Sequence, residues 1–187
     1  MNARVAVLMG GLSAEREVSL SSGAACAEAL TRLGHEVHRL DVGADLAARL
    51  TALAPDLCFN ALHGRYGEDG CVQGLLELLR LPYTHSGVRA SAVAMHKPTA
   101  CQLFEDAGMR VPAGRLATLA EVAAGEVMAP PLVVKPVAEG SSVGVLVIDD
   151  LDDPRLAPNE PAAAAQAMLV EPFVPGAELT CAVLDGR

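Results

Sequence analysis

Residues 5–11 read V-A-V-L-M-G-G, and this stretch decides the fold. An unbroken apolar run that ends on a pair of glycines is typical of a strand buried on both faces of a parallel sheet. From residue 18 to residue 33 the apolar positions recur at helical spacing, and Gly34 stands where a left-handed helix cap is expected. A buried strand followed at once by a helix predicts an α/β fold.

The same alternation continues up to about residue 85. Strands are predicted over 37–42 and 57–62, and helices over 45–54 and 71–79. We therefore predict a doubly wound parallel-sheet α/β domain at the N-terminus, over residues 1–90. The helix over 71–79 should bury one apolar stripe, made of Leu75, Leu76, Leu78 and Leu79.

The second half of the chain has a different pattern. Residues 91–107 predict one or two bridging helices, interrupted near Lys97. Residues 91–187 are expected to hold these helices and an incomplete α+β central domain, because the chain stops at a turn signal, Asp185-Gly186-Arg187. In this domain short strands are predicted over 132–135, 143–148, 168–173 and 179–184, and weak helices over 119–127 and 161–167.

The amino-acid composition argues against several classes of function before any motif is considered. Fourteen basic and 23 acidic side chains give a net charge of −9, and only 3% of the 187 residues are aromatic, which argues against a nucleic-acid partner. The five cysteines are scattered, so neither a disulfide framework nor a zinc knuckle is expected. No segment resembles a signal peptide or a membrane span. The expected partner is a small molecule, and the expected compartment is the cytoplasm.

Two motifs follow the first and third predicted strands. G-G-L-S-A-E spans residues 10–15, and H-G-R-Y-G-E-D-G spans residues 63–70. Ligands bind outside the carboxyl ends of the strands in open α/β sheets, so both motifs are expected at one edge. Glu15 can meet a cationic substrate group or merely complement a helix dipole, and His63 can bind a ligand or be a structural histidine.

A third motif covers residues 132–145, L-V-V-K-P-V-A-E-G-S-S-V-G-V. An apolar strand delivers Lys135, and the small-residue turn with Ser141 and Ser142 can form an anion-binding concavity from its N–H groups. The alternative is a lysine that snorkels beside an ordinary hairpin turn. Neither G-x-G-x-x-G nor G-K-[ST] occurs, which speaks against a nicotinamide-dependent oxidoreductase.

A fourth motif, L-V-E-P-F-V-P-G-A-E at residues 169–178, breaks a strand with prolines. Its unpaired backbone groups suit the edge of a planar base, and Glu171 and Glu178 can hold an amine and a ribose, although such carboxylates are usually just solvated. Lys97 is a lone basic residue that opens a helix and can equally be an exposed side chain.

Taken in order, these motifs and L-P-Y-T-H-S-G at 81–87 resemble the D-alanine:D-alanine ligase family of the ATP-grasp superfamily. The resemblance implies an α/β N-terminal domain, a central α+β domain and a C-terminal domain, with ATP held between the last two. The implied reaction phosphorylates the carboxylate of one D-alanine with ATP. The amine of a second D-alanine then displaces phosphate, which gives the dipeptide for peptidoglycan synthesis.

The resemblance also implies a role for each matching residue. Glu15 would bind the ammonium of the first D-alanine, His63 would lie near the same substrate, and Ser141 would hold the closing loop. The lysines would contact the phosphates of ATP, and Mg²⁺ would bridge those phosphates through ligands expected beyond Arg187. The residues implied to hold ATP are Lys97, Lys135, Ser142, Glu171, Phe173, Val174 and Glu178.

Alternatives stay open. The chain can be an ATP-grasp ligase with another second substrate, such as D-lactate, or a non-catalytic nucleotide-binding or dimerisation module. A homodimer is expected from the resemblance alone. The 187-residue chain by itself is expected to be inactive, an expectation that D-alanine-dependent release of ADP would contradict.

Overall fold

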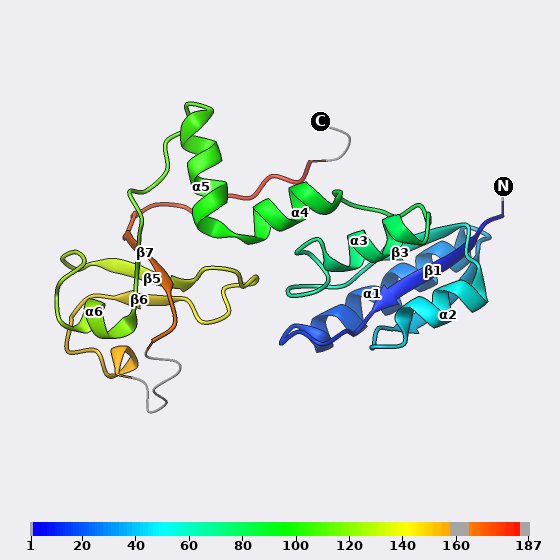
Figure 1. The fold of residues 1–187 in the computed structure, drawn as a ribbon, viewed down its shortest axis with the longest axis horizontal. Helices are drawn as coiled ribbons and strands as arrows, with labels where there is room; N and C mark the ends of the chain where they lie inside the picture. Colours follow the sequence, from blue (N-terminus) through cyan, green and yellow to red (C-terminus); the bar gives the residue numbers. More distant parts are fainter. Residues whose placement is uncertain (1, 158–164, 184–187) are drawn as a thin grey trace. The chain divides into compact units, whose positions relative to one another are not determined.

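The computed structural model describes residues 2–157 and 165–183 (Figure 1). The contacts of the chain divide it into two units. The first holds residues up to 111 together with residues 136–144, and the second holds residues 112–135 and the described residues from 145 onward. Each unit has its own sheet and its own hydrophobic core. The proposed domain division at residue 90 stays a prediction.

The first unit is built on β1 (Arg4–Met9), which lies between β2 (Glu36–Asp41) and β3 (Leu57–Asn60) in a parallel sheet of order β2-β1-β3. Val5 is level with Val37 in β2 and with Leu57 in β3. After Arg4 every residue of β1 is buried, as expected for a central strand covered on both faces. The predicted parallel α/β sheet is confirmed.

Helices cover both faces of this sheet. α1 (Arg16–Arg32) packs on the face of β1 that carries Val5 and Val7. α2 (Leu46–Leu53) and α3 (Cys71–Leu78) pack on the opposite face, because neighbouring residues of a strand point to opposite sides. The chain passes from β1 to β2 and then returns to β3 on the far side of β1. The loops after β1 and β3 therefore border the switch point, where ligands bind in sheets of this kind.

One predicted detail of α3 is wrong. Leu76 is fully buried, but Leu78 is 84% exposed and takes no part in a core stripe. Residues two apart lie about 200° apart around a helix, so burial of Leu76 turns Leu78 toward solvent.

Helices α4 (Val88–Met95) and α5 (Lys97–Asp106) complete the first unit. His96 between them has an extended backbone, and its ring accepts a hydrogen bond from the backbone N–H of Thr99. Pro98 lies in the first turn of α5, where its missing N–H would have had no helical partner. The predicted interruption near Lys97 is confirmed.

The second unit contains a four-stranded sheet in the order β4-β7-β5-β6. β4 pairs antiparallel with β7, and β5 pairs antiparallel with β6. The strands are β4 (Arg115–Ala117), β5 (Leu132–Pro136), β6 (Leu146–Ile148) and β7 (Met168–Pro172).

Two short helices close the core of the second unit. α6 (Leu119–Ala123) begins at a capping box, in which the side chains of Thr118 and Glu121 each accept from the other's backbone N–H. The 3₁₀ helix η1 (Pro154–Leu156) places Leu156 in the core. The helix predicted over 119–127 is therefore present but shorter.

Some strand predictions in this unit are wrong. The strand expected over 143–148 is limited to β6, and residues 179–183 form no strand and lie exposed. An apolar segment becomes a strand only where a neighbour pairs with it, and no described strand pairs with residues 179–183. The helix predicted over 161–167 lies mostly outside the described residues, and the turn at 185–187 lies wholly outside them.

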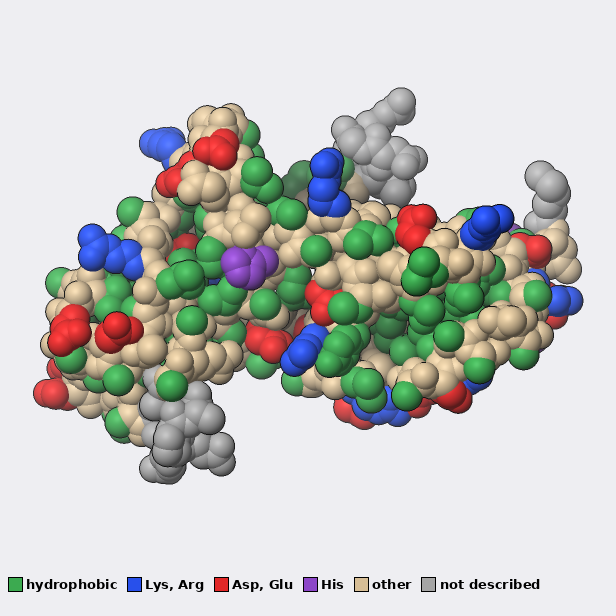
Figure 2. Space-filling view, viewed as in Figure 1, with side chains coloured by type: hydrophobic (Ala, Val, Ile, Leu, Met, Phe, Trp, Pro, Cys, Tyr) green, Lys and Arg blue, Asp and Glu red, His purple; other side chains and the backbone are tan. Residues whose placement is uncertain are grey.

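The surface shows no concentration of basic side chains on the face drawn in Figure 2, where Lys and Arg are scattered among acidic groups. Among the helices of the described ranges, none combines the length and the apolar character needed to cross a bilayer.

Candidate functional site

Glu15 stands just beyond the carboxyl end of β1 and is the N-cap residue of α1. Its N–H donates to Ser13 Oγ at 3.2 Å, and the Ser13 hydroxyl donates to the carbonyl of His63 at 2.7 Å. These bonds join the loop after β1 to the loop after β3. The two motifs expected at one edge of the sheet do meet there.

The side chain of Glu15 is buried in the first unit. Only 6% of the residue is exposed, and Oε2 has no hydrogen-bond partner within the described residues. A buried polar atom without a hydrogen-bond partner lowers the stability of the fold, so we expect a bound ligand to donate a hydrogen bond to this oxygen. The carboxyl group is therefore the strongest sign of a binding site in this unit.

Two glycines make room for that oxygen. A Cβ at Gly64 would lie 2.3 Å from Glu15 Oε2, and a Cβ at Gly140 would lie 3.2 Å from it. Gly64 also has a φ of +68°, which favours glycine. Side chains at either position would fill the space beside the Glu15 carboxyl group.

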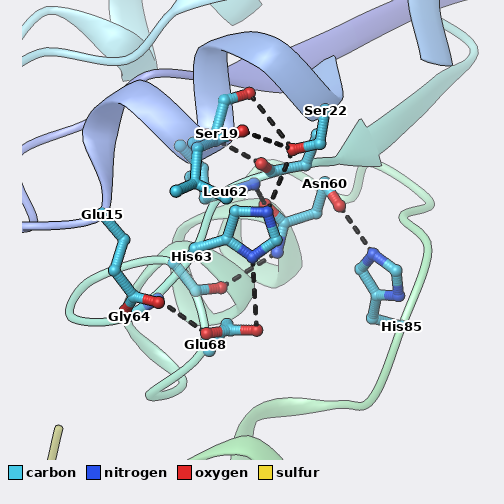
Figure 3. Close-up of polar contacts among 12 residues, drawn as sticks. Glu15, Ser19, Ser22, Asn60, Leu62, His63, Gly64, Glu68 and His85 are labelled. Carbon is cyan, nitrogen blue, oxygen red and sulfur yellow. Dashed lines mark hydrogen bonds and ion pairs between the residues drawn. The ribbon is translucent and has the colours of Figure 1, made fainter. Parts of the chain in front are cut away.

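The ring of His63 has a polar side chain on each side (Figure 3). Its Nε2 is 3.0 Å from Ser22 Oγ on α1, and its Nδ1 is 3.9 Å from Glu68 Oε1. The other oxygen of Glu68 accepts from the backbone N–H of Gly64 at 2.6 Å. Glu68 thus folds back within the loop after β3 and binds the backbone of Gly64, the first glycine of that loop.

Buried amides hold the rest of this loop. The carbonyl of Gly67 accepts from Asn60 Nδ2 at 2.9 Å and from Gln73 Nε2 at 2.8 Å. Asp69 loses solvation, but hydrogen bonds from the backbone N–H groups of Tyr66 and Cys71 outweigh that loss and lower the pKa of Asp69. The loop is therefore fixed at both ends before any ligand arrives.

Cavities flank the loop on the first unit. One of about 250 Å³ is lined by Glu68, Lys97, Glu139 and Gly140, together with Ala94 and Met95. Gly140 also lies near Glu15, because a Cβ added at Gly140 would come within 3.2 Å of Glu15 Oε2. A larger cavity of about 450 Å³ reaches His63 and Glu68 from the side of α1 and α4.

Lys97 ties the segment 136–144 to the first unit. Its backbone N–H donates to the carbonyl of Val137 at 2.9 Å, and its ammonium donates to the carbonyls of Pro136, at 2.9 Å, and Glu139. Lys97 is half-buried by these contacts, so the interpretation as a simple exposed side chain is wrong.

Ser141 and Ser142 form the tip of that segment. Both have a positive φ, +47° and +58°, and the N–H of Val143 closes the turn onto the carbonyl of Gly140 at 3.0 Å. A positive φ is uncommon outside glycine, so two such serines in succession mark a tight turn. The exposed tip is compatible with the predicted phosphate loop.

Lys135 and Glu171 form an ion pair in the second unit, between neighbouring strands β5 and β7. The Glu171 side chain is 5% exposed and the Lys135 side chain 25%. A lysine at the end of a buried strand was expected to have a partner, and here the partner is the carboxylate predicted to face adenine.

The segment after β7 carries the remaining predicted ATP residues. The N–H of Phe173 donates to the carbonyl of Pro131 at 3.1 Å, which extends the edge of β7 beyond Pro172. Val174 and Glu178 lie exposed in an extended stretch. The structure thus groups Glu15 and His63 in the first unit and Lys135 and Glu171 in the second.

Within residues 2–157 and 165–183, no group of three or more His, Cys, Asp or Glu side chains is arranged to hold a metal ion. The residues that sequence reasoning missed are Ser13, Ser22 and Glu68. Glu68 lies inside a motif recognised in the sequence, and Ser22 follows Glu15 by seven residues, which is two helical turns. The sequence could therefore have pointed to both residues, but not to the residues that they contact in the fold.

The parallel sheet of the first unit, the antiparallel sheet of the second and the lysine on β5 together define an α/β protein of the ATP-grasp class. A family model described as D-ala D-ala ligase N-terminus matches residues 41–86, and one described as D-ala D-ala ligase C-terminus matches residues 115–187. The chain belongs to the D-alanine–D-alanine ligase family.

Individual relatives agree with this assignment. The chain is 57% identical over 186 residues to the D-alanine–D-alanine ligase of Cereibacter sphaeroides strain ATCC 17025, covering 98% of this chain and 59% of the relative. It is 54% identical to the ligase of Methylobacterium radiotolerans, covering all of this chain and 62% of the relative. The chain therefore spans about 60% of the length of the curated relatives it matches.

Solved structures show the same likeness. The D-alanine–D-alanine ligase of Bacillus anthracis matches with a TM-score of 0.75 and 30% identity, covering 92% of this chain and 58% of that one. The crystal structure of the same enzyme complexed with ATP matches with a TM-score of 0.74 and 28% identity, over 93% of this chain and 60% of the other.

Proposed function

We propose that the chain supplies the first-substrate site and much of the ATP site of a D-alanine:D-alanine ligase that works in peptidoglycan synthesis. The observation that carries this proposal is the buried, unpartnered Oε2 of Glu15 between Gly64 and Gly140. An ammonium group offers the donors and the positive charge that this oxygen lacks. Family membership then favours D-alanine as the amino acid that brings the ammonium.

The proposed reaction has two displacement steps. A carboxylate oxygen of the first D-alanine attacks the γ-phosphorus of ATP, and ADP leaves with the electron pair of the broken bond. The amine of the second D-alanine then attacks the carbonyl carbon of the acyl phosphate, and phosphate leaves. Carboxylate is a poor electrophile, so phosphorylation supplies the leaving group, and catalysis consists mostly of positioning and charge stabilisation.

The first-substrate residues act by position. Glu15 would hold the ammonium of the first D-alanine, and His63 would lie against the same molecule. Ser141 would keep the loop closed above it, since Gly140, the neighbour of Ser141, leaves no room for a side chain beside the Glu15 carboxyl group.

The residues predicted to bind ATP would contact different parts of the nucleotide. Lys97 and Lys135 would offset the phosphate charge beneath Ser142. The adenine amino group would donate to Glu171, the backbone of Phe173 and Val174 would face the adenine edge, and Glu178 would accept from the ribose hydroxyls.

Mg²⁺ would screen the phosphates when bound, but the described residues include no ligand set for it, so no step is assigned to it here. A homodimer in the cytoplasm, with no nucleic acid or membrane as partner, completes the proposal. A ligase that joins D-alanine to another second substrate, such as D-lactate, shares every residue discussed above. Product analysis with mixed D-substrates separates the two.

The direct test is calorimetric titration of D-alanine into the purified chain. Wild type should bind D-alanine, and Glu15→Gln should weaken that binding about tenfold or more, because the ammonium loses a charge-assisted hydrogen bond. Glu17→Gln is the matched control, since Glu17 is an exposed residue of the same helix. Equal binding by wild type and Glu15→Gln would refute the assignment of Glu15.

A further inference from the structure

Both ring nitrogen atoms of His63 face a polar side chain, Nε2 that of Ser22 at 3.0 Å and Nδ1 that of Glu68 at 3.9 Å (Figure 3). We infer that Ser22 fixes this ring with a hydrogen on Nε2 and that Glu68 is a positioning residue for the first-substrate site. The inference rests on the proposed function in one respect only, that the site beside Glu15 takes an amino acid.

The hydroxyl of Ser22 decides the tautomer. Its oxygen lies 2.9 Å from the carbonyl of Val18 and 3.4 Å from the carbonyl of Ser19, and both of these groups can only accept. A serine has one hydroxyl hydrogen, and in a helix it commonly goes to the carbonyl one turn back. The contact of 3.0 Å between Ser22 and His63 must then use a hydrogen on His63 Nε2.

This tautomer leaves Nδ1 of the neutral ring without a hydrogen, facing Glu68 Oε1 at 3.9 Å. Figure 3 shows the carboxyl group of Glu68 between the His63 ring and the backbone of Gly64. The loops after β1 and β3 therefore carry three acceptor atoms that lack a hydrogen of their own: Glu15 Oε2, Glu68 Oε1 and His63 Nδ1. An ammonium group has donors only, so the tautomer set by Ser22 matches the site to that ligand.

Glu68 acts on the site through the backbone. Its Oε2 accepts from the N–H of Gly64, the residue whose Cα lies against Glu15 Oε2. Removal of the carboxylate would release Gly64, the wall of the site, and would also free the Nδ1 side of the His63 ring. Glu68 is therefore expected to matter for binding even if it never touches the substrate.

The test combines a spectroscopic measurement with a binding measurement. Long-range ¹H–¹⁵N correlation spectra of the chain labelled at histidine report which ring nitrogen carries the hydrogen, and His63→Gln identifies the signal. We expect the Nε2–H form in wild type. Ser22→Ala should lose that preference, whereas Ser22→Thr, which keeps the hydroxyl, and Ser21→Ala, an exposed neighbour on the same helix, should retain it.

Glu68→Gln should shift the His63 signals and weaken D-alanine binding about tenfold, the loss expected for one charge-assisted hydrogen bond. A wild-type Nδ1–H form, or Ser22→Ala and Glu68→Gln with unchanged spectra and unchanged D-alanine affinity, would overturn the inference. Failure of wild type to bind D-alanine would instead count against the proposed function, and the spectra would still decide the tautomer.

Discussion

The Cα of Gly64 lies directly against Glu15 Oε2, so closely that one added methyl group would come within 2.3 Å of that oxygen. The contact joins the first glycine of the loop after β3 to the N-cap residue of α1.

Gly64→Ala should therefore abolish D-alanine binding and lower the free energy of unfolding by about 1 to 3 kcal/mol, because the methyl group meets the carboxyl group and φ is positive. Gly74→Ala is the matched control. It adds a methyl group to helix α3 where no atom lies within 4 Å, and it should leave binding unchanged and stability equal or higher. Calorimetry and thermal melts measure both effects; equal behaviour of the two variants would contradict the prediction.

Lys135→Ala should destabilise the second unit as well as weaken ATP binding. Glu171 is 4% exposed, and removal of the ammonium leaves its carboxylate without that cation, at a cost of about 1 to 3 kcal/mol. Chemical denaturation of Lys135→Ala, Glu171→Ala and the double variant measures the coupling between the two side chains. Purely additive losses would show that the pair does not stabilise the fold.

Glu178→Ala separates ATP binding from stability. Glu178 is exposed, so its removal should change the free energy of unfolding by less than about 0.5 kcal/mol. If Glu178 accepts from the ribose hydroxyls, the same change should weaken ATP binding several-fold in a titration. An unchanged ATP affinity would remove Glu178 from the site.

Asp153 should make the second unit sensitive to acid. The side chain of Arg155, followed by its backbone N–H, lowers the pKa of Asp153 from 3.8 to about 2. Because the pKa is lowered in the folded state, the stabilisation is complete above pH 4 and disappears as the pH falls toward 2. Arg155 also donates to the carbonyl of Val147 in β6 at 2.8 Å, so protonation of Asp153 loosens this link.

Denaturation curves at several pH values test this. Asp153→Asn should be less stable than wild type at pH 7, and the difference should vanish near pH 2. Asp152→Asn, an exposed neighbour, should match wild type throughout. A difference between Asp153→Asn and wild type that does not depend on pH would argue against the ion pair as its cause.

The succession of strands and helices along the first unit could be predicted because its signals are local. The run of apolar residues in β1, the helical spacing of α1 and the glycines that end them all lie within one window of sequence. The meeting of Glu15 and His63 followed from a general rule about the carboxyl ends of parallel strands.

The features that could not be predicted depend on residues that are distant in the sequence but close in the fold. The strand expected over 179–184 had a suitable apolar pattern but no described neighbour to pair with, and Leu78 faced solvent although its neighbours are apolar. The contact of Ser22 with His63 and the return of Glu68 onto Gly64 arise from tertiary geometry. No spacing rule predicts such contacts.

The hydrogen bonds from Lys97 to the carbonyls of Pro136 and Glu139 matter when the chain is cut into fragments. A peptide that stops at Val111 contains the whole parallel sheet, yet it would lack these carbonyls and Gly140, which lies near Glu15. The segment 136–144 belongs to the same unit, although residues 112–135 of the other unit separate it from Val111 along the chain. If the proposed amino-acid site is correct, a fragment cut at Val111 should bind D-alanine more weakly than the full chain even where its parallel sheet is intact.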